Sequence, residues 1–171
     1  MVAITQKITK VLEIFLIILM SAIVIDVTWQ VVTRFILQDP SSFTEELAGF
    51  LLIWIGLLGA SYAIYTKAHL GIDILARKID VNARKKLDVV IYSIVILFSF
   101  FILVVGGWRL VNITFTLNQI SPSMGLPMGY VYIVLPLTGV LIIYYSIFHI
   151  FMALIKSDTT ATRENSITAV D

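Results

Sequence analysis

The fold of this chain is decided by long apolar runs, and the longest of them, residues 89–117, reads VVIYSIVILFSFFILVVGGWRLVNITFTL. Arg109 is the only charged residue in this run. A helix crosses the hydrocarbon core of a bilayer with about 20 mostly apolar residues. Because the run is continuous rather than alternating, it predicts a membrane-spanning helix and not a strand of a membrane β-barrel.

Three further runs meet the same criterion, at about residues 11–37, 47–66 and 129–155. The chain is 59% apolar or aromatic and only 13% charged, whereas a soluble domain is about 25% charged. This composition excludes an ordinary soluble enzyme, a disordered chain and a nucleic-acid-binding protein. We therefore expect an all-α integral membrane protein with one four-helix transmembrane domain over residues 1–156 and a polar tail over residues 157–171.

The basic residues predict the orientation of these helices. Ten of the 12 lysines and arginines would lie on one side of the membrane, namely Lys7, Lys10, Lys67, Arg77, Lys78, Arg84, Lys85, Lys86, Lys156 and Arg163. The two loops on the other side contain none. By the positive-inside rule, both termini and the central loop are expected in the cytoplasm. The first run is too long for a signal peptide and lacks a convincing cleavage site, so we expect an uncleaved helix.

The connections between the spans carry their own signals. The stretch Ser42-Phe43-Thr44-Glu45 fits a capping box that opens the second helix. In the cytoplasmic connector, Ile72, Leu75 and Ile79 recur with helical spacing, while Asp73, Arg77 and Lys78 fall elsewhere. That pattern predicts a short amphipathic helix in the headgroup plane, between helices 2 and 3. A solvated connector is the alternative.

An ionisable group inside a bilayer is a candidate functional residue, and Asp26 lies near the middle of the first span. Asp26, Gln30 and Thr33 share one helix face. This polar stripe is interpreted either as a buried seam against another helix or subunit, or as a proton or ion site. The seam is favoured because no second acid lies at similar depth.

Two arginines and two glutamates occupy a different depth. Arg34 and Arg109 fall in the outer third of their helices, and Glu45 and Glu46 begin the second helix on the same side. Acidic residues also favour the positive N-terminal end of a helix. We expect these four residues to form interhelical ion pairs, with a substrate-binding arginine as the alternative.

Small residues mark one side of the second helix. Gly49, Gly56 and Ala63 recur every seven residues, and Gly59 and Ala60 lie beside them. Small residues let helix backbones approach closely in lipid. The pattern predicts a packed helix interface, either inside this chain or with another subunit.

The sequence offers little support for catalysis. The two histidines, His69 and His149, could ligate a haem between helices, but an interfacial histidine on each helix is the simpler interpretation. There is no HExxH motif, no P-loop and no plausible Ser/His/Asp set, and there is no cysteine. We therefore expect neither an enzyme nor a metal centre.

The chain nevertheless resembles a known family. The stretch from Phe43, FTEELAGFLLIWIGLLGASYA, and the following KAHLGID at residues 67–73 resemble the second-helix region of small permease subunits of TRAP transporters, the DctQ-like family. Arg34-Phe35 near the end of the first helix fits the same pattern. Phe43 departs mildly from the tryptophan that the family often has. The resemblance covers the length of the chain and all four spans.

The resemblance implies a three-part, sodium-driven importer of organic acids in the bacterial inner membrane, for C4-dicarboxylates, sialic acid or similar carboxylates. A periplasmic binding protein captures the substrate, a large elevator-type subunit moves it and couples to sodium, and the small subunit is a scaffold without a cofactor. The implied partners are the large permease subunit, the binding protein and membrane lipids, and no nucleic acid.

The same resemblance assigns roles to residues. Gly49, Gly56 and Ala63 would pack within the scaffold, and Glu45 and Glu46 would contact the binding protein or the large subunit. Asp26 and Arg34 would form structural pairs, while His69 and Asp73 would fix the start of the connector. Two other classes stay open: a stand-alone proton-coupled exporter that uses Asp26, and a haem-bearing membrane anchor that uses His69 and His149.

Overall fold

The computed structural model describes residues 2–39, 41–66 and 81–168, with side chains from 3 to 153 outside the gaps at 40 and 67–86. Its elements are α1 (Val2–Phe35), α2 (Ser42–Tyr65), α4 (Val81–Phe98), the π-helix η1 (Ser99–Gly106), α5 (Gly107–Thr116), α6 (Met128–Tyr132) and α7 (Val134–Thr168). Four helical stretches are long and apolar enough to span a membrane: Ala3–Phe35, Ser42–Tyr65, Leu87–Thr116 and Met128–Ala153. The all-α membrane fold is therefore confirmed, whereas the cytoplasmic placement of the two ends stays a prediction.

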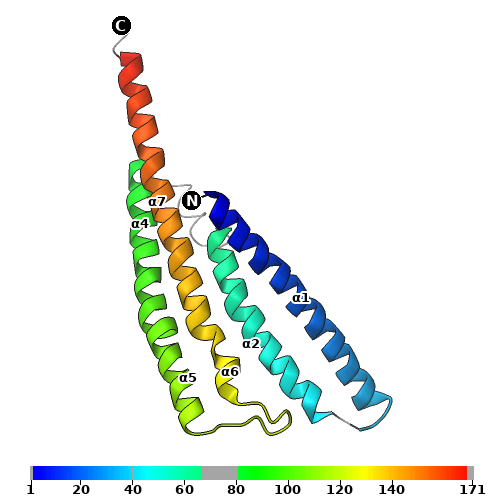
Figure 1. The fold of residues 1–171 in the computed structure, drawn as a ribbon. Coiled ribbons are helices and arrows are strands. Elements are labelled where there is room, and N and C mark those ends of the chain that lie inside the picture. Colours follow the sequence, from blue (N-terminus) through cyan, green and yellow to red (C-terminus); the bar gives the residue numbers. More distant parts are fainter. Residues whose placement is uncertain (1, 40, 67–80, 169–171) are drawn as a thin grey trace.

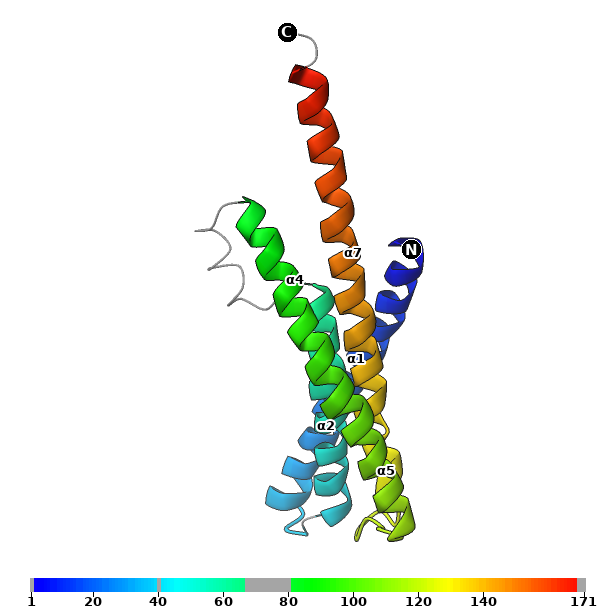
Figure 2. The same cartoon turned by 90° about the vertical axis from the view of Figure 1, so that its left-hand side faces the viewer.

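The helices form an open layer instead of a closed bundle. α1 packs against α2, α2 against α7, and α7 against α4 and η1, so that α1 and the α4–η1–α5 helix form the two edges (Figure 1). The layer is twisted along its length. At the end with the two short loops the helices are spread in the plane of Figure 1, whereas at the opposite end they are spread in the plane of Figure 2. We call these ends the short-loop side and the connector side.

An open layer buries few side chains. In the most apolar 18-residue stretch of the fourth span, 39% of the residues are buried. In the corresponding stretch of the third span, which lies at an edge, only 6% are buried. The buried apolar core is correspondingly small, and its central cluster consists of Leu12, Leu58, Val134 and Tyr145. Lipid tails are as apolar as these side chains, so the exposed helix faces suit a bilayer or a membrane partner.

Glycines allow a close approach between the fourth span, formed by α6 and α7, and the third span. A Cβ atom on Gly139 would lie 2.8 Å from the Leu103 Cβ, and one on Gly107 would lie 2.9 Å from the Leu135 Cβ. A Cβ on Gly129 would lie 2.6 Å from the Phe115 ring. The two helices therefore pack backbone to backbone, and a side chain at any of these positions would push them apart.

The structure refines the helix ends. The capping-box prediction is wrong, because the N-cap of α2 is Ser41 and not Ser42. The Ser41 side chain also makes no capping hydrogen bond. The chain already turns at Ser41, whose carbonyl accepts hydrogen bonds from the Glu45 N–H (3.4 Å) and the Thr44 hydroxyl (2.9 Å). The fourth span is interrupted between α6 and α7, where Pro136 removes the N–H that would bond to the Tyr132 carbonyl.

Candidate functional site: the two ends of the layer and its exposed faces

Glu46 fastens the second short loop to the start of α2. The backbone N–H groups of Ser123 and Met124 donate to the Glu46 Oε2, at 2.9 and 3.2 Å. The loop closes on itself through the Ser121 N–H to the Leu126 carbonyl, at 2.8 Å, and turns at Gly125, whose φ of 65° favours glycine. Glu46 therefore fixes the shape of the short-loop side.

The predicted ion pairs between the outer charges are wrong within this chain. Arg34 and Arg109 are exposed, and in the part of the chain that the structure describes neither forms an ion pair or a side-chain hydrogen bond. Arg109 lies on α5, which packs mainly against α6, η1 and α7 and not against the start of α2, whereas Arg34 lies on α1 beside α2 but forms no ion pair with either glutamate among the described residues. The Glu46 carboxylate accepts hydrogen bonds from the second short loop, and Glu45 is exposed. Contact of these charges with a partner stays a prediction.

The polar stripe of α1 faces the protein interior. Asp26 and Thr33 are buried and Gln30 is half-buried; the main neighbour of α1 is α2. The Thr33 hydroxyl donates to the Gln30 carbonyl at 3.0 Å, whereas the buried Asp26 Oδ2 has no hydrogen-bond partner among the described residues. Burial of Asp26 and Thr33 is compatible with a polar seam between α1 and α2, and the seam stays a prediction.

The small residues of α2 do not pack inside the chain, contrary to the expectation that they pack within the scaffold. Gly49, Gly56 and Ala60 are exposed, and apart from the adjoining backbone of α2 no atom of the described residues lies within 4 Å of a Cβ built on Gly49, Gly56 or Gly59. Gly59 and Ala63 are only half-buried. They belong to helix faces that α1 and α7 leave partly uncovered, and a subunit interface there stays a prediction.

A polar and aromatic cluster ties the helices together toward the connector side. The His149 Nε2 donates to the carbonyls of Ile64 and Tyr65, both at 3.1 Å, near the end of α2. Its ring also stacks on Tyr92 of α4, with the ring centroids 5.2 Å apart. Because carbonyls only accept hydrogen bonds, the Nε2 carries the proton and is not available as a haem ligand. His149 is thus a structural link between α2, α4 and α7.

Two hydroxyl contacts extend this cluster to α1. Thr5 and Tyr144 lie within hydrogen-bond distance at 2.9 Å, as do Thr9 and Tyr145 at 3.2 Å. Sequence reasoning missed these residues, although the polar groups on an otherwise apolar fourth helix were a usable signal. Four residues expected to act in the connector, His69, Asp73, Arg77 and Lys78, lie outside the described residues.

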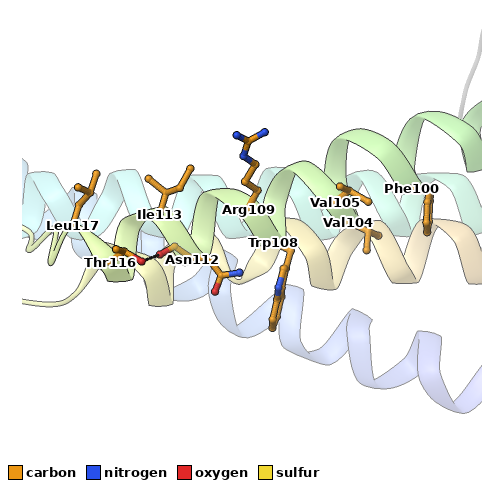
Figure 3. A pocket seen from close by; sticks show the side chains of 9 residues that line it. All are labelled: Phe100, Val104, Val105, Trp108, Arg109, Asn112, Ile113, Thr116 and Leu117. Atoms are coloured by element: carbon orange, nitrogen blue, oxygen red, sulfur yellow. Dashed lines mark hydrogen bonds between the residues drawn. The ribbon is translucent and has the colours of Figure 1, made fainter.

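A groove of about 760 Å³ runs along the exposed side of the third span (Figure 3). Two rows of side chains line it, and within each row the residues are four apart in sequence. The first row is Phe100, Val104, Trp108, Asn112 and Thr116, and the second is Val105, Arg109, Ile113 and Leu117. Eight of them belong to η1 and α5, and Leu117 directly follows α5, so the groove belongs to the free edge of the layer.

Comparisons with known proteins point in one direction. Residues 23–155 match the model of the family described as "Tripartite ATP-independent periplasmic transporters, DctQ component". The chain is 31% identical to the sialic acid TRAP transporter small permease protein SiaQ of Vibrio cholerae, over 81% of this chain and 79% of that protein. It is 30% identical to a putative TRAP transporter small permease protein of Haemophilus influenzae, over 79% of this chain and 82% of that protein.

A further relative is much longer than this chain. The isethionate TRAP transporter permease protein DctMQ of Oleidesulfovibrio alaskensis is 28% identical over 72% of this chain, but the match covers only 20% of that protein.

Proposed function

This chain belongs to the family of DctQ components of tripartite ATP-independent periplasmic transporters, and from that premise we propose that it holds the large permease subunit as a fixed scaffold during sodium-coupled uptake of an organic acid. The family is a transporter component and not an enzyme. The observation that carries the scaffold role is the open layer, whose second helix exposes small residues that none of the described residues covers.

The exposed face of α2 has the chemistry of a helix-docking surface. Gly49, Leu52, Ile53, Gly56 and Ala60 are exposed on it, and their spacing places them along one side of the helix. Small residues permit close backbone approach between membrane helices. We define these five residues as the α2 face and propose that a helix of the large subunit packs on it.

The contacts at the two ends of the layer suit a scaffold that keeps its shape while its partner moves. Toward the connector side, His149 bonds α7 to α2 and stacks on α4. On the short-loop side, Glu46 bonds α2 to the loop that follows α5. Between them, Gly107 and Gly139 hold the third span against α7. The second, third and fourth spans are therefore connected to one another by contacts that do not involve the α2 face.

The partner and substrate classes rest on the relatives. The long protein named DctMQ matches this chain over only a fifth of its length, which supports a larger membrane partner for a chain of this size. The relatives' names specify sialic acid and isethionate, and both are organic acids. We propose an organic acid as the substrate and a bacterial inner-membrane location with both termini cytoplasmic, which makes the short-loop side periplasmic. Exposed Glu45 and the loop held by Glu46 would then face the binding protein.

Co-purification tests the scaffold role. The variant Gly56→Leu adds a bulky side chain to the α2 face, where a Cβ atom would have no neighbour within 4 Å among the described residues, so the isolated subunit is expected to fold normally. The large subunit, co-expressed and recovered on a tag carried by this chain, is expected to fall at least about tenfold, a loss of about 1.4 kcal/mol.

The matched control is Gly106→Leu, an exposed glycine on the third span, which is expected to recover the large subunit at the wild-type level. Wild-type recovery with Gly56→Leu would contradict docking on the α2 face. Failure of the wild-type chain to recover any large subunit would contradict the scaffold role itself.

A further inference from the structure

We propose that the groove along the third span is a phospholipid site, in which Arg109 binds the phosphate of a lipid on the short-loop side and the groove holds an acyl chain. The proposal concerns the free edge of the layer and does not depend on the scaffold role. It rests on the charge, the depth and the shape of the groove.

The charge of the groove is uncompensated. Arg109 is exposed on the edge helix, and within the described residues it has no ion pair and no hydrogen bond. An unpaired cation inside a membrane span is unfavourable unless it reaches water or an anion. Asn112 is also exposed, one turn closer to the short loop, but it belongs to the other row of lining side chains and its amide points away from the guanidinium (Figure 3).

The depth of Arg109 matches the phosphate level. The third span covers Leu87–Thr116, and Arg109 lies seven or eight residues beyond its midpoint, which is about 11 Å along a helix with a rise of about 1.5 Å per residue. The hydrocarbon core extends about 15 Å from the bilayer midplane. A long arginine side chain bridges the remaining few ångströms to the headgroups. The neighbouring Trp108 is 62% exposed and lies at the depth where tryptophan favours the membrane interface.

The groove continues from this polar end toward the midplane. Between the two rows of side chains, it passes Val105 and Val104 and reaches Phe100, so that an acyl chain attached to a phosphate at Arg109 would follow it. Phe100 and Val105 are each 48% exposed and need an apolar neighbour. The groove also differs in charge from the α2 face, because it carries a cation, Arg109, that an apolar helix would leave without an anion. A lipid fits this edge better than a protein helix.

Native mass spectrometry of the full-length chain tests the proposal. The chain is released from micelles that contain phosphatidylglycerol, and the retained lipid is compared between wild type and Arg109→Gln. Because charge-assisted hydrogen bonds to a phosphate are lost, retention is expected to fall about tenfold or more. Diacylglycerol, which has no phosphate, is expected to be retained equally and weakly by both proteins.

Arg34→Gln is the matched control, since Arg34 is also exposed and unpaired among the described residues but lies at the other edge of the layer. It is expected to retain phosphatidylglycerol as the wild type does. Equal losses in the two variants would show diffuse charge attraction and overturn the site, as would unchanged retention in Arg109→Gln.

A second variant keeps the charge and blocks the groove. Val105→Trp is expected to lower phosphatidylglycerol retention although Arg109 is present, and unchanged retention would overturn the acyl-chain part of the proposal. If Arg109→Gln instead reduces recovery of the large subunit while lipid retention stays at the wild-type level, the groove is a protein interface and the proposal fails.

Discussion

The contact between α7 and the π-helix predicts a specific cost for one added methyl group. In Gly139→Ala, the new Cβ would lie 2.8 Å from the Leu103 Cβ and the Val104 Cγ2, and 3.1 Å from the Val104 backbone nitrogen. Two of these three atoms are backbone or directly attached to it, so no side-chain rotation relieves the contact. The helices must separate, and overpacking of this kind costs about 1–3 kcal/mol.

The same substitution also changes helix propensity, which favours alanine over glycine by about 1 kcal/mol. Gly56→Ala controls for this gain, because a Cβ on Gly56 has nothing within 4 Å. The difference between the two variants isolates the packing term. We expect Gly139→Ala to be less stable than Gly56→Ala by about 1–3 kcal/mol.

Reversible unfolding of the isolated subunit by sodium dodecyl sulfate in mixed micelles, followed by circular dichroism and tyrosine fluorescence, measures this difference. Equal midpoints for Gly139→Ala and Gly56→Ala would refute the close approach of α7 to the third span. Larger destabilisation by Gly56→Ala would refute the open α2 face as well.

The remaining predictions concern single polar contacts. His149→Phe keeps an aromatic ring but leaves the Ile64 carbonyl without this donor, and we expect a loss of about 1–3 kcal/mol in the same unfolding assay, with His149→Gln less affected. Glu46→Gln weakens the hold on the loop, so hydrogen exchange at the Ser123 amide should quicken while α2 stays protected; unchanged exchange would contradict this role. Asp26→Asn should leave transport by the complete complex within about twofold of wild type, because the seam is structural; abolished transport would favour a proton site.

The spans were predictable because the hydrophobic signal is local. The run at residues 89–117 already exceeds what a bilayer requires, and the structure places a span at Leu87–Thr116. The inward-facing stripe at Asp26 and Thr33 was also predictable, since three polar residues on one helix face are unfavourable in contact with lipid. Neither inference needs to know which helix is the neighbour.

The pairings were not predictable, because they depend on the order of helices in the layer. Charge and depth suggested that Arg34 and Arg109 pair with the glutamates, but α5 packs mainly against α6, η1 and α7, and Glu46 bonds to the second short loop instead. The spacing of small residues predicted close packing at Gly49 and Gly56, whereas the close contacts between helices lie at Gly107, Gly129 and Gly139. A glycine pattern indicates that a face can be approached closely, and tertiary structure decides which face has a neighbour.

The most direct test of the central claim uses the absence of cysteine from this chain. A single Gly56→Cys variant carries a thiol-attached photo-crosslinker on the α2 face, and Ile94→Cys carries it at the α4 edge, where Ile94 is 62% exposed. In membranes that contain the complete transporter, the account predicts a crosslink from position 56 to the large subunit and none from position 94. Crosslinking to the large subunit from position 94 alone would contradict it.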